Sequence, residues 1–248
     1  MTDILPQGET GADLWHARSR DVAPPMHPQF EDAGSELPAK RSPRSVGTSV
    51  WLRSGQTVFN QGDASRYAYT IASGAVRLST MHSAGHRQIV AFLFAGDMFG
   101  LESDRMHGLS AETLCRTELL LYPRALVERS GEALGISESN IVSLVRRDLA
   151  IAYSHLLVVG RQTAAERVAS FLLKLMGDER ICNGRVLELP MGRLDIADFL
   201  GLTMETVSRS LGTLRRKGII GIPQRHRIEF KDVIALTLMA AGEQSGHA

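Results

Sequence analysis

The chain has 248 residues, a formal net charge of +1 and 44% hydrophobic residues, so it is long enough for two domains. Its two cysteines exclude a disulfide framework and cannot supply the four ligands of an iron–sulfur cluster. No apolar run reaches the roughly 18 residues that cross a membrane, and the N-terminus lacks the basic start and apolar core of a signal peptide. We therefore expect a cytoplasmic protein without a membrane partner.

Residues 1–45 differ in composition from the rest of the chain. They hold most of the prolines, and their apolar residues are sparse and aperiodic. Such a composition cannot bury enough apolar surface to offset the entropy of ordering the chain. We expect a flexible N-terminal extension here.

Residues 46–135 have the pattern of a small antiparallel domain. Short β-branched or aromatic runs alternate with glycines, and turn signals recur every ~8–12 residues, as in a β-barrel or sandwich. The expected strands are Thr57–Phe59, Tyr67–Ala72, Ala75–Thr80, Gln88–Phe94 and Thr113–Tyr122. Pro123 ends the last strand, and a short helix is expected over 124–129.

Residues 136–161 are expected to form one long amphipathic helix. Six apolar residues recur at intervals of three and four, which gives a coiled-coil-like seam. These residues are Ile141, Val145, Leu149, Ala152, Leu156 and Val159. Because one helix cannot bury such a stripe alone, we expect a dimerisation helix and a homodimer.

Residues 162–248 combine short helices with two hairpins. The expected elements are helices over 164–176 and 232–241, hairpins around Asn183-Gly184 and Pro223–His226, and a pair of short helices within Asp195–Ile220. A helix pair followed by a hairpin is the order of a winged helix.

The helix pair has recognisable start and stop signals. The first helix is expected over 194–200, and Gly201-Leu202 forms the turn. Thr203 is a favourable N-cap for the second helix, which ends before Gly218.

The second helix of the pair has an apolar face and a polar face. Val207, Leu211 and Leu214 share the apolar face, and Glu205, Ser208, Arg209, Gly212 and Arg216 share the polar one. Arginine can donate two bonds to guanine, glutamate can accept from cytosine, and serine bonds either way, so this face can read base edges. Gly212 would allow close approach. The alternative is a solvated face with an internal Glu–Arg pair at i, i+4.

Positive charge is concentrated around this helix. Residues 203–231 contain seven Lys or Arg against two Glu, although the whole chain is nearly neutral. The cations include the runs Arg215–Lys217 and Arg225–Arg227. A basic footprint confined to one end of the chain indicates nucleic-acid binding there.

Glycine-punctuated motifs recur along the chain. Gly55–Asp63 is GQTVFNQGD, Gly74–Leu78 is GAVRL, Gly96–Gly100 is GDMFG and Ala165–Leu173 is AERVASFLL. These segments resemble the CRP/FNR superfamily of bacterial transcription regulators, and the resemblance covers about residues 46–240. Asp195–Leu211 is similar to the FNR/FixK branch, whose recognition helix carries E-x-x-S-R.

The resemblance implies an α+β chain with three parts after the extension. These are an N-terminal cyclic-nucleotide-binding-like β-roll as a sensor-like domain over 46–135, the dimerisation helix over 136–161, and a C-terminal winged helix-turn-helix DNA-binding domain over 162–248. It also implies a regulator, in most cases an activator, that contacts RNA polymerase and binds double-stranded DNA as a homodimer. The genes of a FixK-type regulator would be oxygen-responsive or serve nitrogen fixation and microaerobic growth.

The resemblance further implies a TTGA-N8-TCAA-type palindrome and a role for each polar side chain. Arg209 would pair with guanine, Glu205 would accept from cytosine on the other strand, and Ser208 would contact thymine. The implied phosphate contacts are Thr203, Thr206, Arg216, Lys217, Arg225 and Arg227.

The usual effector residues of the family are missing. Cyclic-nucleotide members bind the phosphate through an Arg-Ser pair, and Leu109-Ser110 stands there, so a buried phosphate would lack a cation. Residues 1–45 contain no cysteine for an iron–sulfur cluster. Such absences are typical of FixK-type regulators, which act downstream of a separate oxygen sensor, and we expect no cofactor. The alternative is a small-molecule-responsive regulator with haem or another ligand in the β-roll, for which His82, His86 and His107 are the candidate ligands.

An enzyme is disfavoured by the absence of motifs. The sequence has no phosphate-cradling GxxxxGK[ST], no G-x-S-x-G and no clustered His/Cys metal motif. We therefore expect a protein that is not an enzyme and has no metal site.

Cys182 lies at the Asn-Gly hairpin, between Arg180 and Arg185. Positive neighbours lower the pKa of a thiol and raise its reactivity. Two interpretations stay open: an inert thiol, or a redox-sensitive thiol whose oxidation adds negative charge near DNA and weakens binding.

Overall fold

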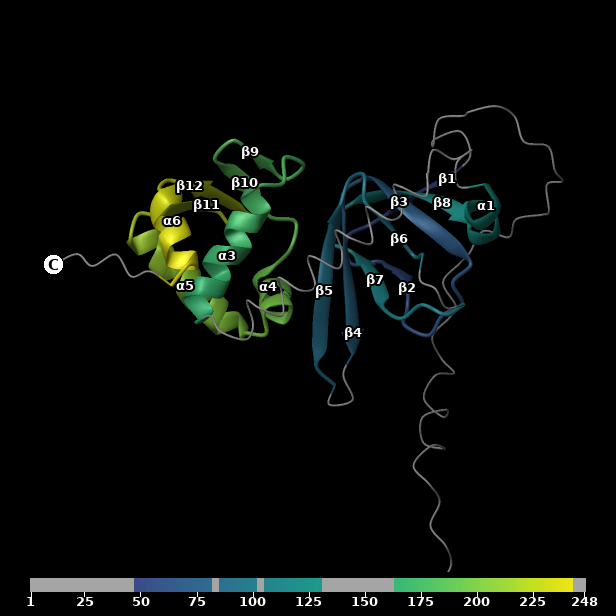
Figure 1. The fold of residues 1–248 in the computed structure, drawn as a ribbon, viewed down its shortest axis with the longest axis horizontal. Helices are drawn as coiled ribbons and strands as arrows, with labels where there is room; N and C mark the ends of the chain where they lie inside the picture. Colours follow the sequence, from purple (N-terminus) through teal and green to yellow (C-terminus); the bar gives the residue numbers. More distant parts are fainter. Residues whose placement is uncertain (1–46, 82–84, 102–104, 131–162, 243–248) are drawn as a thin grey trace, which may run out of the picture. The chain divides into compact units, whose positions relative to one another are not determined.

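The computed structural model describes residues 47–81, 85–101, 105–130 and 163–242, all within one unit that spans Glu36–Ala248. The expected extension over 1–45 and the expected dimerisation helix over 136–161 lie outside the described residues. A β-roll comes first in the chain, and a domain of helices and short strands follows it (Figure 1). The predicted α+β fold class is confirmed.

The β-roll consists of two four-stranded antiparallel sheets. One has the order β1 (Thr48–Leu52), β8 (Thr117–Pro123), β3 (Tyr67–Ser73), β6 (Met98–Phe99). The other has the order β2 (Thr57–Phe59), β7 (Ser110–Thr113), β4 (Ala75–Met81), β5 (Arg87–Phe94). Tyr69 and Leu119 from the first sheet pack against Val58, Val76 and Leu93 from the second, and α1 (Arg124–Ser130) follows β8.

The single strand expected over Thr113–Tyr122 is wrong. β7 ends at Thr113 and β8 begins at Thr117, in the other sheet. Two buried hydroxyls make the crossing: Thr113 Oγ1 donates to Arg53 O at 2.5 Å, and Thr117 Oγ1 lies 3.2 Å from Ala75 O. Cys115 therefore lies half-buried in this connection and not in a strand of the core.

Gly74 fits the crossing because it has no side chain. Its φ is +95°, and a Cβ there would lie 2.5 Å from Thr117 Oγ1. Any other residue would collide with the start of β8 in addition to straining the backbone.

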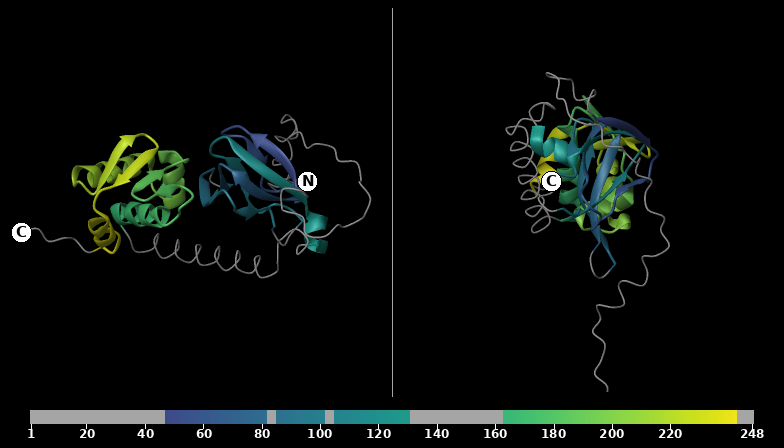
Figure 2. Two further views of the ribbon diagram at one scale, coloured as in Figure 1. Left: turned by 90° about the horizontal axis from the view of Figure 1, so that it is seen from above. Right: turned by 90° about the vertical axis from the view of Figure 1, so that its right-hand side faces the viewer.

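The C-terminal domain has a helical core and a small antiparallel sheet, which lie together in Figure 2. Its elements are α3 (Ala164–Met176), β9 (Cys182–Asn183), β10 (Val186–Glu188), α4 (Arg193–Leu200), α5 (Met204–Arg216), β11 (Ile220–Gln224), β12 (Arg227–Phe230) and α6 (Val233–Ala240). The sheet order is β11-β12-β10-β9. The expected helices and both hairpins are present, with bounds that differ from the expectation by one or two residues.

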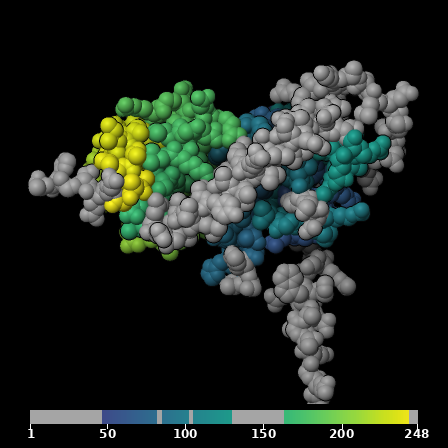
Figure 3. Space-filling view, in the orientation of Figure 1, coloured from purple at the N-terminus to yellow at the C-terminus, as the bar shows by residue number. Residues whose placement is uncertain are grey.

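The core of this domain is formed by α3, α4 and α5. Val168, Leu172, Ile196, Leu200 and Leu214 are each at most 1% exposed. Helix α6 lies on the surface, in yellow in Figure 3, and its Ile234 is 76% exposed. None of the helices that the structure describes is long and apolar enough to span a membrane.

Asp195 is a buried carboxylate near the start of α4, and it is fully paired. Its Oδ2 accepts the Gly192 N–H at 3.0 Å, which caps the helix. Its Oδ1 lies 2.7 Å from Arg77 Nη1 and 2.9 Å from Arg87 Nη2. A charge buried to this degree requires such partners, so these contacts fix the N-terminal turn of α4.

Candidate DNA-binding site

The turn between α4 and α5 sets the angle of the second helix. Gly201 adopts the left-handed conformation, with φ 64° and ψ 42°, and the Leu202 N–H returns to Ala197 O at 3.0 Å. Thr203 is the N-cap of α5, and its Oγ1 accepts the Thr206 N–H at 3.2 Å. The predicted turn and N-cap are confirmed.

The two faces of α5 are separated as the sequence predicts. Val207, Leu211 and Leu214 are buried at 0%, 2% and 0% exposure. The buried side chains hold the helix on α3 and α4. On the other side Glu205, Ser208, Arg209 and Arg216 are exposed.

The exposed side chains of Glu205 and Arg209 do not pair with each other. No ion pair joins Glu205 to Arg209 within the described residues, so the alternative of an internal Glu–Arg pair has no support there. Arg209 Nη2 instead donates to Thr206 Oγ1 at 3.3 Å. A carboxylate acceptor and a guanidinium donor are therefore presented together to solvent.

Gly212 lies between these groups and the C-terminal turn. A Cβ there would meet only Arg216 Nη1, at an ordinary contact distance of 3.5 Å. Packing within the protein therefore does not require glycine at this position.

Cations extend from the end of α5 to the wing formed by β11 and β12. Arg215, Arg216 and Lys217 are exposed, at the helix end where the dipole favours positive charge. On the wing Arg225 is exposed at the turn, whereas Arg227 Nε lies 3.5 Å from Glu188 Oε1. The two wing arginines thus differ, because only Arg227 has a carboxylate partner among the described residues.

Arg193 is a further cation that the sequence reasoning missed. It is the first residue of α4, and its Nη1 is buried without a hydrogen-bond partner in the described part of the chain. Burial and the nearby Arg225 both lower the pKa of Arg193. A cation at a helix N-terminus interacts unfavourably with the helix dipole. This unfavourable placement is the feature of the sequence that could have indicated a functional role for Arg193.

Comparison with known proteins decides the family. Residues 166–239 match the Crp-like helix-turn-helix domain, and residues 49–130 match the cyclic nucleotide-binding domain. The nitrogen fixation regulation protein FixK of Rhizobium meliloti is 39% identical over 216 residues, which cover 86% of this chain and 95% of that protein. The chain belongs to the CRP/FNR family of transcription regulators, in its FixK-type branch.

Further relatives agree with this assignment. The FixK protein of Azorhizobium caulinodans is 37% identical over 77% of this chain and 79% of its own length. The solved structure of FixK2 from Bradyrhizobium japonicum is 38% identical and superposes with a TM-score of 0.71, covering 78% of this chain and 97% of that one. The FixK-type branch consists of DNA-binding regulators, as expected, and not of enzymes.

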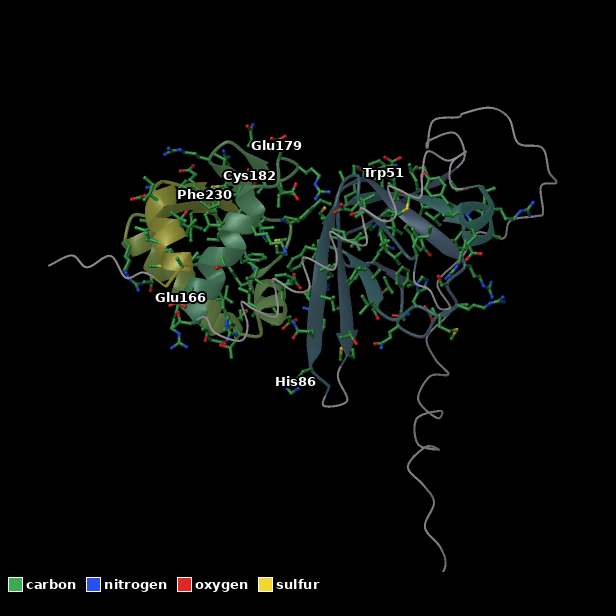
Figure 4. The ribbon with its side chains drawn as sticks, viewed as in Figure 1. Trp51, His86, Glu166, Glu179, Cys182 and Phe230 are labelled. Carbon is green, nitrogen blue, oxygen red and sulfur yellow. The ribbon has the colours of Figure 1, made fainter. Side chains whose placement is uncertain are left out.

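Cys182 of this FixK-type regulator lies in a more buried environment than its charged sequence neighbours suggest. It is 5% exposed on β9 (Figure 4), and its Sγ lies 3.6 Å from Gly184 O. Burial raises the pKa of the thiol, which is opposite to the expected direction. Arg180 is bound to Asp178 at 2.6 Å, and Arg185 Nη1 donates to Lys231 O at 3.4 Å.

The β-roll of this FixK-type regulator contains a cluster of aromatic rings in its core. Phe59, Tyr69 and Phe99 lie with ring centroids 5.1–5.9 Å apart. His107 is 2% exposed and stacks on Phe59, with the two ring centroids 3.5 Å apart, whereas His86 is exposed. His82 lies outside the described residues, within which no group of three or more potential metal ligands occurs.

The Leu109-Ser110 pair, where we expect no phosphate-binding arginine, has a structural role in the β-roll. Ser110, of the Leu109-Ser110 pair, opens β7, and its Oγ accepts the Gln61 N–H at 2.9 Å. This hydroxyl is therefore used to hold the β2–β7 edge together.

Proposed function

We propose that this FixK-type regulator binds a TTGA-N8-TCAA-type palindrome as a homodimer and activates transcription. Its genes would serve nitrogen fixation, as the names of the FixK relatives suggest, or would be oxygen-responsive and serve microaerobic growth, as the resemblance to this branch implies. Because its target is DNA, we place it in the cytoplasm.

The exposed triad of Glu205, Ser208 and Arg209 is the observation that carries the proposal. These residues lie on one side of α5, opposite Val207 and Leu211. Arg209 would donate to guanine, Glu205 would accept from the cytosine amino group, and Ser208 would contact thymine. The three contacts together account for the G·C pair and for one thymine of the half-site.

Phosphate contacts would position this helix in the major groove. The hydroxyls of Thr203 and Thr206 lie at the positive N-terminus of α5, where anions are favoured. The remaining proposed contacts are Arg216, Lys217, Arg225 and Arg227, and Arg193 joins them. A phosphate oxygen near Arg193 and Arg225 would supply the acceptor that Arg193 Nη1 lacks.

A homodimer would place two such helices ~34 Å apart, one turn of DNA. The proposed interface is the seam of Ile141, Val145, Leu149, Ala152, Leu156 and Val159, which the sequence alone supports. A palindromic site follows from this two-fold symmetry.

RNA polymerase is the proposed second partner. A related protein of Rhizobium leguminosarum bv. viciae, 33% identical over 76% of this chain, carries the name probable transcriptional activator. The candidate contact surfaces are the loops at 82–87 and 103–109, of which only 85–87 and 105–109 are described.

We further propose that DNA binding requires no effector or cofactor. Leu109 stands where an arginine would bind a cyclic phosphate, and aromatic rings pack together in the core of the β-roll. The competing candidate is a haem-responsive regulator, for which the buried His107 is the best-placed ligand among the described histidines. Haem titration followed by absorbance separates the two, because ligation to histidine gives a distinct Soret band.

The deciding experiment is selection of bound duplexes from a random pool, with purified protein and no added ligand. Recovery of TTGA half-sites in an inverted pair would support both the specificity and its independence from an effector. Recovery of unrelated sequences would contradict the proposed readout, and binding only after addition of cAMP or haem would contradict effector independence.

A further inference from the structure

A chain of hydroxyls connects the N-cap of α5 to the guanidinium of Arg209. Thr203 Oγ1 lies 3.0 Å from Thr206 Oγ1, and Arg209 Nη2 lies 3.3 Å from the same Thr206 Oγ1. Thr203 Oγ1 also accepts the Thr206 N–H at 3.2 Å. The arginine is thus tied through two side chains to the first turn of its own helix.

The donors and acceptors in this chain can be counted. A guanidinium has only donors, so Thr206 Oγ1 must accept from Arg209. Thr203 and Thr206 have two hydroxyl protons, and one of them is used in the bond between them. Only one hydroxyl proton is left for a phosphate oxygen, whichever of the two residues donates it.

The same arrangement recurs at a second arginine–threonine pair on this helix. Arg216 Nη2 donates to Thr213 Oγ1 at 2.9 Å, again across three residues, while Thr213 Oγ1 donates to Arg209 O at 3.0 Å. Thr213 anchors a cation near the C-terminal end, whereas Thr206 anchors the cation at the base-reading face. Of these two contacts, only the one between Thr206 and Arg209 can influence sequence preference.

We infer that Thr206 is a positioning residue for base recognition: its hydroxyl holds Arg209 in place to meet guanine. The inference rests on the proposed function and gives Thr206 a role beyond a phosphate contact. An unanchored arginine loses rotamer freedom when it binds, and a pre-placed one has less to lose. That advantage applies only where Arg209 meets the two acceptors of guanine. Thr206 would therefore affect the discrimination between guanine and the other bases.

The test compares Thr206→Val, which keeps the shape and removes the hydroxyl, with Thr206→Ser, which keeps the hydroxyl. Affinity is measured for a duplex with two TTGA half-sites and for matched duplexes in which the guanine is replaced. We expect Thr206→Val to reduce the ratio of these affinities by on the order of three- to tenfold, the scale of one hydrogen bond, and Thr206→Ser to retain it. Thr213→Val is the matched control and should leave the ratio unchanged.

Other outcomes overturn the inference. An unchanged ratio in Thr206→Val, with equal weakening on every duplex, would make Thr206 a phosphate contact only. Loss of the ratio in Thr206→Ser as well would exclude the hydroxyl as the cause. Thr206→Ala, which favours helix more than valine does, replaces Thr206→Val if circular dichroism shows reduced folding.

A double-mutant cycle provides a second criterion. In an Arg209→Ala background, Thr206→Val should no longer change the ratio, and a change of equal size there would refute the proposed coupling. Failure of the proposed function is distinguishable, because the wild-type protein itself would then show no preference for TTGA.

Discussion

Arg209 is the side chain on which we expect sequence preference to depend most strongly. Its guanidinium is exposed and faces no carboxylate partner among the described residues. Arg209→Ala should cost about 1–3 kcal/mol on a TTGA duplex and relax the preference at the guanine. Fluorescence anisotropy with the four base variants at that position measures both effects. If the variant retains full discrimination, another residue reads the guanine.

Lys217 is a proposed phosphate contact, and such a contact carries no sequence information. It is exposed at the C-cap of α5. Lys217→Ala should weaken binding alike on all sequences and make the slope of log K against log salt shallower by about one unit for each lost contact. Arg53→Ala, at an exposed arginine of the β-roll outside the basic footprint, is the control. An unchanged slope in Lys217→Ala would remove Lys217 from the phosphate contacts.

Cys182 shows how burial outweighs charged neighbours. Its raised pKa keeps the thiol protonated at pH values where an exposed cysteine has begun to ionise. Alkylation by iodoacetamide should therefore be slower at Cys182 than at the half-buried Cys115, and should accelerate only as pH rises through the raised pKa. Peptide mass spectrometry after timed labelling measures both rates.

The redox hypothesis for Cys182 is tested with the same protein. We expect peroxide to affect DNA binding equally in wild type and Cys182→Ser, because a thiol reacts as its thiolate. Selective loss in the wild type would show that this hairpin opens enough for oxidation and would restore the redox interpretation.

At the scale of elements, Gly212 separates helix stability from DNA binding. A methyl group at this position meets no backbone and no core atom, and alanine favours helix over glycine by about 1 kcal/mol. Gly212→Ala should therefore raise the melting temperature while weakening binding to the palindrome, because the methyl group would lie between α5 and the bases. A stabilised variant with unchanged affinity would indicate that the helix does not approach DNA closely at Gly212.

The helices of the C-terminal domain could be predicted because their signals are local. Thr203, Gly201 and Gly218 mark ends by capping and by positive φ. The crossing between β7 and β8 could not be predicted in this way. Leu114, Cys115 and Arg116 contain no glycine or proline that would indicate a turn between the two strands. The turn depends instead on hydrogen bonds from the Thr113 and Thr117 hydroxyls to backbone carbonyls that are distant in sequence.

In the candidate site, too, features set by local sequence could be predicted, and features set by tertiary packing could not. The 3.6-residue period is sufficient to place Glu205, Ser208 and Arg209 opposite Val207. It does not reveal that Arg193 and Arg225 are neighbours, since they come from α4 and the wing turn. Nor does it give the burial of Cys182, which depends on the packing of β9 within the domain.

In the proposed homodimer, the affinity for DNA depends on two recognition helices that act together. One recognition helix reads only a half-site. Linking two half-site contacts makes the second an intramolecular event and raises affinity by orders of magnitude without a new contact. The proposed seam at 141–159 would therefore be as important for function as the polar face of α5, although the two are far apart in sequence.

A charge in the middle of that seam tests the dimer. Leu149→Asp should give monomers in analytical ultracentrifugation, because an unpaired carboxylate in an apolar interface is costly. Its affinity for the full palindrome should fall towards that for a single half-site. Arg147→Asp changes charge on the same predicted helix away from the seam, so it should remain dimeric. A Leu149→Asp monomer that still binds the palindrome as tightly as the wild type would show that two-fold binding does not originate in this helix.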